Sequence, residues 1–128
     1  MQVFGLTGIS KQVVDDLVEN GGRTIEIRSS HNLASATRVE PGDLIFVTRH
    51  SRDDLTPGVE GVLARVVAKE FAMRRVGVYS VNEVEEQEVE VARLKLEMVT
   101  ACRAAKAEVY GVVRETIFYF SQRVIECW

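Results

Sequence analysis

The chain has 128 residues, of which 46% are hydrophobic and 27% are charged, and its formal net charge is −3. This length and composition predict one globular domain and exclude a disordered chain. The small negative charge excludes a protein coated in positive charge for long duplex DNA. The chain has two cysteines, no apolar run long enough to span a bilayer and no signal-peptide pattern at its start. We therefore expect a cytoplasmic protein without a disulfide framework or a membrane partner.

The charges are unevenly distributed along the chain. Residues 23–75 contain nine basic and seven acidic side chains, whereas residues 83–97 contain six acidic and two basic ones. Twelve of the sixteen basic residues are Arg, which makes flat, bidentate contacts to phosphate, carboxylate or base edges. Most of these charges are expected on a solvated, ion-paired surface. The acidic segment would repel RNA, so we expect it on the side away from a binding site.

The first part of the chain predicts a strand, a helix and then several strands. Residues 2–6 have the character of a short strand, and Ser10 is a candidate N-cap for a helix that ends at Gly21. Further strands are predicted at 23–29, 43–48, 59–71 and 73–81. Polar loops are predicted at 30–41, with a helical turn near 33–36, and at 49–57. The long strand from residue 59 predicts a bend or bulge, and it would contribute Val62, Val66 and Val67 to the core.

The last part of the chain is more ambiguous. The stretch from Asn82 to Glu85 has the form of a capping box and predicts a helix that runs to about Ala105. Alternation of apolar and polar residues around Leu94 leaves a shorter helix followed by a strand as the alternative. Residues 108–113 predict a strand. The tail favours a helix, although residues 116–120 also have strand propensity. The apolar face of that helix would consist of Ile117, Phe120, Val124 and Trp128.

The order of these elements predicts a single α+β domain, with a core at 2–81 and a C-terminal extension at 82–128. Consecutive strands joined by short loops do not alternate with helices as in a parallel α/β sheet. They are typical of a mixed, barrel-like sheet that helices flank or plug.

One stretch, from Gly21 to Arg28, carries a recognisable motif. Its sequence is Gly-Gly-Arg-Thr-Ile-Glu-Ile-Arg, and on a strand Ile25 and Ile27 would face one side while Thr24, Glu26 and Arg28 face the other. Together with Gly42-Asp43 and the run 61–66, the ordered set over residues 9–71 resembles the ASCH family of the PUA-like superfamily. The resemblance implies a PUA-like mixed β-barrel with flanking helices. The whole chain also resembles an uncharacterised archaeal protein family.

The resemblance to ASCH domains implies a cleft that takes RNA, a nucleotide or a nucleoside. Carried over by position, it nominates Arg23, Thr24, Glu26 and Arg28 as the residues that line the cleft. A row of two cations, a hydroxyl and a carboxylate offers donors and acceptors for base edges and phosphate. The structural alternative is a strand whose charged residues pair with one another. In the polar loop after the 43–48 strand, the candidate phosphate contacts are His50 and Arg52. The leading prediction is a noncatalytic binding module for RNA or a nucleotide-like small molecule, without metal or other cofactor.

The resemblance also gives an enzymatic alternative. Some ASCH proteins resemble amidohydrolases that cleave acylated cytidine, in which a Lys activates a Thr nucleophile and a Glu from a later strand assists. Thr24 would be the nucleophile, and Glu60 or Glu70 would supply the carboxylate. Arg23 stands where the family has Lys, and an arginine does not release its proton near neutral pH. The nearest lysines in sequence are Lys11 and Lys69.

A third prediction, from a different class, is a homodimeric protein-interaction domain. The C-terminal aromatic residues would form either its dimer contact or part of the core, and they are Phe118, Tyr119, Phe120 and Trp128. The two His and two Cys residues lack the spacing of zinc ligands, so no metal site is predicted.

Overall fold

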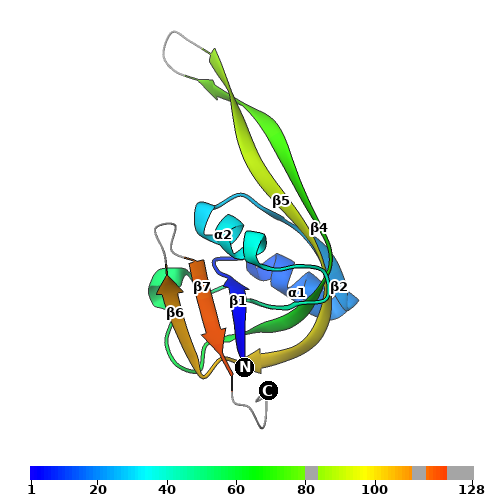
Figure 1. The fold of residues 1–128 in the computed structure, drawn as a ribbon, viewed down its shortest axis with the longest axis vertical. Coiled ribbons are helices and arrows are strands. Elements are labelled where there is room, and N and C mark those ends of the chain that lie inside the picture. The colour runs from blue at the N-terminus through cyan, green and yellow to red at the C-terminus, as the bar shows by residue number, and fades with distance from the viewer. Residues whose placement is uncertain (80–83, 111–114, 121–128) are drawn as a thin grey trace.

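A computed structural model describes residues 1–79, 84–110 and 115–120. In this part of the chain, seven strands form one sheet, accompanied by two α-helices and a short 3-10 helix (Figure 1). The strands are β1 (Gln2–Leu6), β2 (Gly22–Ile27), β3 (Leu44–Val47), β4 (Glu60–Tyr79), β5 (Val84–Arg103), β6 (Lys106–Tyr110) and β7 (Glu115–Tyr119). The helices are α1 (Lys11–Asn20), α2 (Ser30–Arg38) and the 3-10 helix η1 (Arg52–Asp54).

The strands pair in the order β2-β5-β4-β3-β1-β7-β6. The pair β1–β3 is parallel, whereas the other pairs between the described strands are antiparallel. The prediction of a mixed α+β fold is therefore confirmed. The predicted barrel is not confirmed, because β2 and β6 remain the two edges of the sheet in the described residues. The sheet also does not divide at residue 81, since β5 lies between β2 and β4.

The N-terminal elements form where their local signals predict them. The Ser10 side chain accepts a hydrogen bond from the Val13 backbone at 3.3 Å, and Gly21 ends α1 in the left-handed conformation with φ of 71°. In β2, Ile25 and Ile27 are buried, as the alternation predicts. Local capping and period-two alternation thus determine α1 and β2.

The helix α2 replaces most of the predicted 30–41 loop and is longer than the expected turn. Its first turn is attached to the end of β1 by Asn32. The Asn32 side chain accepts from the backbone N–H of Thr7 at 2.9 Å and donates to the backbone carbonyl of Thr7 at 2.8 Å. Asn32 and Ser35 are buried with Ala36, so this helix depends on long-range packing that the local sequence does not display.

The strands predicted at 59–71 and 73–81 are one continuous strand, β4. The register against β5 shifts twice, which leaves Val67 on β4 and Val99 on β5 as the extra residues of two bulges. The bulge expected in this strand is thus confirmed. Val62 and Val66 are buried as predicted, but Val67 is 44% exposed, so its assignment to the core was wrong. A bulge residue turns out of the regular alternation.

The helix predicted from Asn82 to Ala105 is wrong, because residues 84–103 form β5; Asn82 itself lies outside the described residues. On β5, Ala92, Leu94 and Leu96 are buried on one face at a spacing of two. β4 pairs along the whole of β5, and β2 pairs with residues 92–97, where the backbone of β5 is therefore hydrogen-bonded on both sides. The alternative prediction, a shorter helix followed by a strand from Leu94, was closer to the structure, although β5 already begins at Val84.

The tail is also a strand rather than the favoured helix. β7 lies between β1 and β6, and its Thr116 and Phe118 are buried, whereas Ile117 and Tyr119 are half-buried. Residues 106–110 form β6, which agrees with the strand predicted nearby. Residues 111–114 and 121–128, which include Val124 and Trp128, lie outside the described part.

Two apolar cores occupy opposite faces of the sheet. The first lies under α1 and α2 and contains Leu17 with Ile25, Ile27 and Leu94. The second centres on Phe46, whose ring lies 4.6 Å from that of Phe118. On β5, Ala92, Leu94 and Leu96 belong to the first core, whereas Cys102, also even-numbered, belongs to the second. The bulge at Val99 explains this change, because one extra residue reverses the facing of those that follow.

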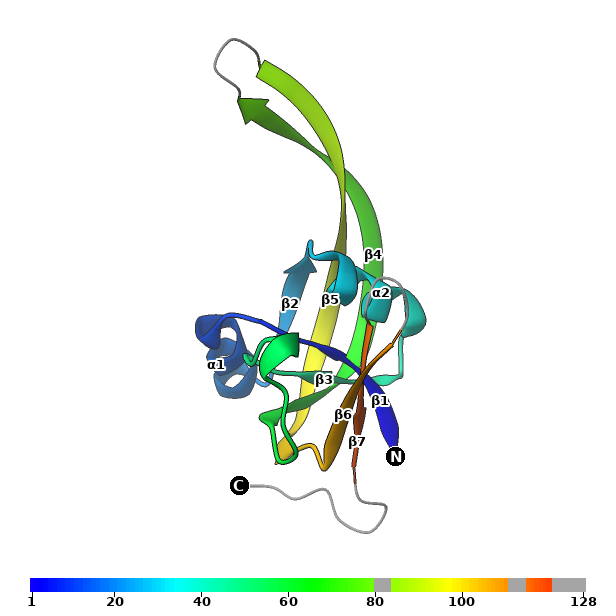
Figure 2. The same cartoon turned by 90° about the vertical axis from the view of Figure 1, so that its left-hand side faces the viewer.

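The hairpin of β4 and β5 extends far beyond the rest of the molecule as a curved two-stranded ribbon (Figures 1 and 2). Nearer the body of the molecule, β2 pairs with β5 and adds a third strand beside this ribbon. Within the described residues, no helix is both long and apolar enough to cross a membrane.

Candidate functional site

The polar residues of β2 lie on the sheet face opposite the first core, where β5 and β4 add charged side chains. Thr24 is the register partner of Lys95, and Glu26 is the register partner of Arg93. Arg93 in turn pairs with Glu70 of β4. Directly paired residues project to the same face of an antiparallel sheet. We call this surface the β2–β5–β4 polar face; it consists of Thr24, Glu26, Arg28, Glu70, Arg93 and Lys95.

A ladder of ion pairs crosses the three strands of this face. Arg28 contacts Oε1 of Glu26 with Nη2 at 2.9 Å and Nε at 3.0 Å. On the other side of Glu26, Nε of Arg93 lies 3.6 Å from Oε2, and Nη1 of Arg93 lies 3.0 Å from Oε1 of Glu70. The Arg28 side chain remains 65% exposed. Both arginines are thus held in place while part of each guanidinium faces solvent.

Lys95 is the cation without a counterpart on this face. Among the described residues, its ammonium group has no ion pair or hydrogen bond, and its side chain is exposed beside Thr24. Two open hollows flank it. One, of about 490 Å³, extends towards Gly21 and Gly22, and the other, of about 200 Å³, extends towards Glu70 and Arg93. The four charges of the ladder cancel. Further along the same side of the sheet, the charges of Glu97 and its register partner Arg65 also cancel, so Lys95 leaves this surface with a net positive charge.

Arg23 does not belong to this row. It shares the parity of Ile25 and turns towards α1, where its Nη1 lies 2.6 Å from Oδ2 of Asp16. Its Nε donates to the backbone carbonyl of Thr24 at 3.3 Å. The structure therefore brings Thr24, Glu26 and Arg28 together. Arg23 instead connects β2 with α1, although it still lines the hollow of about 490 Å³ beside Thr24.

His50 and Arg52 lie away from the polar face. The short helix η1, which contains Arg52, is on the side of β6, whereas β2 is on the opposite side of the body (Figure 1). Arg52 instead lies close enough to His31 of α2 to act on its charge. Burial, reinforced by the charge of Arg52 and opposed by that of Asp53, lowers the pKa of His31 below its usual value. The predicted site is therefore split between two regions.

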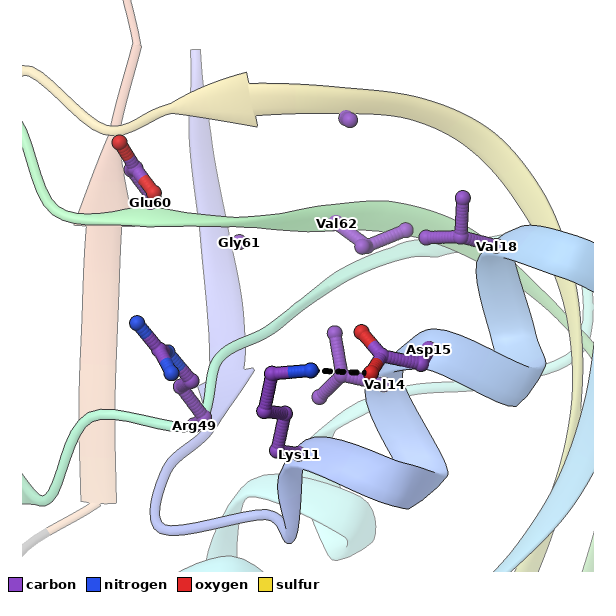
Figure 3. Close-up of a pocket in the computed structure, with 9 residues that line it drawn as sticks. Lys11, Val14, Asp15, Val18, Arg49, Glu60, Gly61 and Val62 are labelled. Atoms are coloured by element: carbon purple, nitrogen blue, oxygen red, sulfur yellow. Dashed lines mark hydrogen bonds and ion pairs between the residues drawn. The ribbon is translucent and has the colours of Figure 1, made fainter.

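Glu60 lines a separate groove between α1 and the start of β4 (Figure 3). It forms an ion pair with Arg103 at 3.0 Å. Thr24 is far from this groove, because it stands across β5 from Ala68, eight residues further along β4. At about 3.3 Å per residue, that is roughly 25 Å along the strand. The structure therefore does not assemble Thr24 and Glu60 into one catalytic site.

A different set of residues surrounds Thr24. The hollow of about 200 Å³ brings it together with Lys95 and Glu70, which are types that the enzymatic alternative requires. Lys69, which was a sequence candidate for the base, lines this hollow too, but its ammonium group donates to the backbone carbonyl of Val39 at 2.7 Å. A lysine becomes a general base through burial, and Lys95 is exposed.

The C-terminal aromatic residues are partly committed to the core. Phe118 has no exposed surface and Phe120 is 5% exposed, and both rings pack on Phe46. Tyr119 donates a hydrogen bond from its hydroxyl to Glu108 at 3.1 Å. A dimer contact through Phe118 and Phe120 would therefore require opening the second core. Within the described residues, no cluster of three or more His, Cys, Asp or Glu side chains is arranged for a metal ion.

Sequence reasoning missed Arg93 and Lys95 as members of the site. They lie in the acidic segment that was expected to face away from it, and that expectation depended on the wrong helix. The alternation from Val91 to Leu96 was the available signal, because on a strand it places Arg93 and Lys95 on one face.

Comparison with known proteins places the chain among relatives that carry no described activity. A family model described as protein of unknown function (DUF473) matches residues 1–118. A protein of Methanocaldococcus jannaschii, described as uncharacterized, is 34% identical over 108 residues, which cover 84% of this chain and 68% of that protein. No solved structure matches the chain.

Proposed function

The chain belongs to the DUF473 family, and from the geometry of its β2–β5–β4 polar face we propose that it is a noncatalytic module that binds RNA or a nucleotide-like small molecule. The observation that carries the proposal is the ladder of Arg28, Glu26, Arg93 and Glu70 beside the unpaired Lys95. Three cations on one face would contact successive phosphates, because guanidinium and ammonium groups are the usual phosphate donors in such interfaces.

The carboxylates of the ladder support this function by positioning the arginines. Glu26 holds Arg28 and Arg93 from opposite sides, so less side-chain freedom is lost when a ligand binds. The hydroxyl of Thr24, exposed next to Lys95, adds a group that both donates and accepts. The two hollows provide space for bases or a sugar beside the cations.

We also propose that the family is related to ASCH domains of the PUA-like superfamily. The support is the order of the motif and its setting. The stretch from Gly21 to Arg28 begins at the end of α1 and forms β2, and Gly42 and Asp43 directly precede β3. An experimental structure compared with ASCH domains tests the relationship, and a different strand order would refute it.

Fluorescence anisotropy with labelled single-stranded RNA oligonucleotides tests the leading function, with nucleotides as competitors. If Arg28, Arg93 and Lys95 each contact one phosphate, raising the salt from about 50 mM to about 200 mM should weaken binding by about twentyfold. A Lys95→Ala variant should bind more weakly and show a smaller salt dependence. The matched control is Arg38→Ala, which removes an exposed cation on α2, on the opposite side of the sheet. Equal affinities of the Lys95 and Arg38 variants, or no binding at low salt, would refute the proposal.

The amidohydrolase alternative rests on the juxtaposition of Thr24, Lys95 and Glu70. It predicts turnover of an acylated cytidine that a Thr24→Ala substitution abolishes. Binding of the same nucleoside without turnover by the natural chain would leave the noncatalytic proposal standing and exclude the enzyme.

A further inference from the structure

We propose that the groove between α1 and the start of β4 is a second, separate binding site, for a small organic monoanion with an apolar body. The groove has a volume of about 280 Å³ and lies at the start of β4, whereas Thr24 stands across β5 from Ala68, further along that strand. Its lining combines an apolar base with charged side chains at the rim. These residues are Lys11, Val14, Asp15, Val18, Arg49, Glu60, Gly61, Val62 and Ala101.

The apolar base comes from two elements that approach each other without closing. Val62 and Ala101 are register partners on β4 and β5, so their side chains lie next to each other facing α1. Across from them, Val14 and Val18 stand one turn apart on α1 (Figure 3). Val18 is 41% exposed although its neighbours in the groove are apolar. A ligand with a small apolar body would cover this surface and gain from its burial.

The rim has one cation without a counterion. Lys11 is paired with Asp15 at 2.7 Å, and Glu60 is paired with Arg103 at 3.0 Å. The side chain of Arg49 has neither an ion pair nor a hydrogen bond in the described part of the chain. It lines the groove and points towards the start of β4, away from α1, in Figure 3. The charged side chains that line the groove sum to zero, but the other three are each held in an ion pair. The charge of Arg49 is therefore the one available to a ligand with a single negative charge.

The backbone around Arg49 is held firmly. The neighbouring Thr48 is fully buried, and its hydroxyl donates to the carbonyl of Glu60 at 2.7 Å and accepts from the N–H of His50 at 3.2 Å. The carbonyl of His50 accepts from the N–H of Gly8 at 2.8 Å. Arg49 is thus presented from a braced segment between β1 and β4. Because this backbone is already ordered, only the side chain of Arg49 loses freedom when it binds an anion.

The size of the groove limits the ligand class. A volume of about 280 Å³ falls just below the range of about 300–1,000 Å³ that is usual for drug-sized ligands. The apolar base suits a short branched aliphatic chain, and Arg49 suits a carboxylate at its end. We therefore assign the site to small aliphatic carboxylates rather than to nucleotides.

The experiment is a titration of the ¹⁵N-labelled full chain with 3-methylbutanoate, followed by amide chemical shifts. Saturable shifts confined to Val14, Val18, Val62 and Ala101 and their neighbours are expected. The neutral 3-methylbutan-1-ol should bind much more weakly. Arg49→Ala should weaken binding of the carboxylate by about tenfold, and Arg49→Lys should restore part of it.

Two further variants complete the design. Val18→Asp places a negative charge in the groove at an exposed helix position, so it should abolish binding while the spectrum keeps its dispersion. Arg65→Ala removes an exposed cation elsewhere on β4 and should leave the affinity unchanged. Equal binding of the alcohol, shifts outside the groove, or an unchanged affinity of the Arg49→Ala variant would each overturn the proposal. Because Lys95 and Arg28 lie outside the groove, failure here would leave the RNA-binding proposal untouched.

Discussion

Lys95 on β5 stands directly across from Thr24 on β2, and the two are register partners in the middle of the polar face. The pairing places an unpaired ammonium group beside an exposed hydroxyl. It also connects the motif on β2 to the ladder that runs through Arg93 to Glu70 on β4. The face that we propose for ligand binding therefore belongs to three strands, one of which comes from the second half of the chain.

Substituting Glu26 should strengthen rather than weaken binding of RNA at low salt. Glu26 neutralises part of the charge of Arg28 and Arg93, so Glu26→Gln removes one negative charge from the face. We expect affinity to rise by about two- to fivefold, which corresponds to the ~0.5–1 kcal/mol of an exposed ion pair. Fluorescence anisotropy with labelled RNA measures the affinity of the natural chain and of the variant. A clear loss of affinity would mean that the positioning of Arg28 and Arg93 by the Glu26 carboxylate outweighs the effect of its charge.

Substitutions of the neighbouring β5 residues Arg93 and Leu94 should differ strongly in their effect on the free energy of unfolding. Leu94 is fully buried in the first core, so Leu94→Ala should lower the free energy of unfolding by about 2–5 kcal/mol. Arg93 lies on the polar face with 39% of its side chain exposed, and Arg93→Ala should cost less than about 1 kcal/mol. Urea denaturation of both variants checks the prediction. Similar losses would contradict the assignment of the two residues to opposite faces.

Acidification should destabilise the fold through His31. Burial, assisted by Arg52, lowers the pKa of His31 in the folded chain below its unfolded value of 6.5. Between these two pKa values the unfolded chain binds more protons, so the free energy of unfolding rises with pH through this window and falls on acidification. His31→Gln should flatten this part of the curve.

Urea midpoints measured on either side of pH 6.5 test this dependence. His50→Gln, which keeps His31, is the matched control. An unaltered slope in the His31→Gln protein would show that other groups cause the dependence.

Gly61 should not tolerate a side chain. A Cβ at this position would collide with the ring of Phe46 and would lie 2.5 Å from the backbone carbonyl of Val47. Gly61→Val should therefore lower the free energy of unfolding by about 1–3 kcal/mol or more, because the packed core around Phe46 must shift. Val67→Ala is the matched control on the same strand, since Val67 is exposed at the bulge and should change stability by less than about 0.5 kcal/mol. Thermal unfolding of both variants measures this difference in stability.

Some parts of the fold follow from short stretches of sequence. The Ser10 cap and the Gly21 terminus define α1, and the alternation after Gly22 defines β2 with the correct residues facing the core. These signals act within a few residues, so they are visible without knowledge of the rest of the chain. They also placed Thr24, Glu26 and Arg28 on one face.

Only the tertiary structure determined the secondary structure of the second half of the chain and which residues form the candidate site. The apolar residues of 84–105 fit both a helical and a strand period, and pairing with β2 and β4 selected the strand. That choice brought Arg93 and Lys95 to Thr24, while packing on α1 drew Arg23 away to Asp16. The segment that contains Arg52 lies on the side of the molecule opposite β2. Such outcomes depend on contacts between residues far apart in the chain, which local propensity and spacing do not encode.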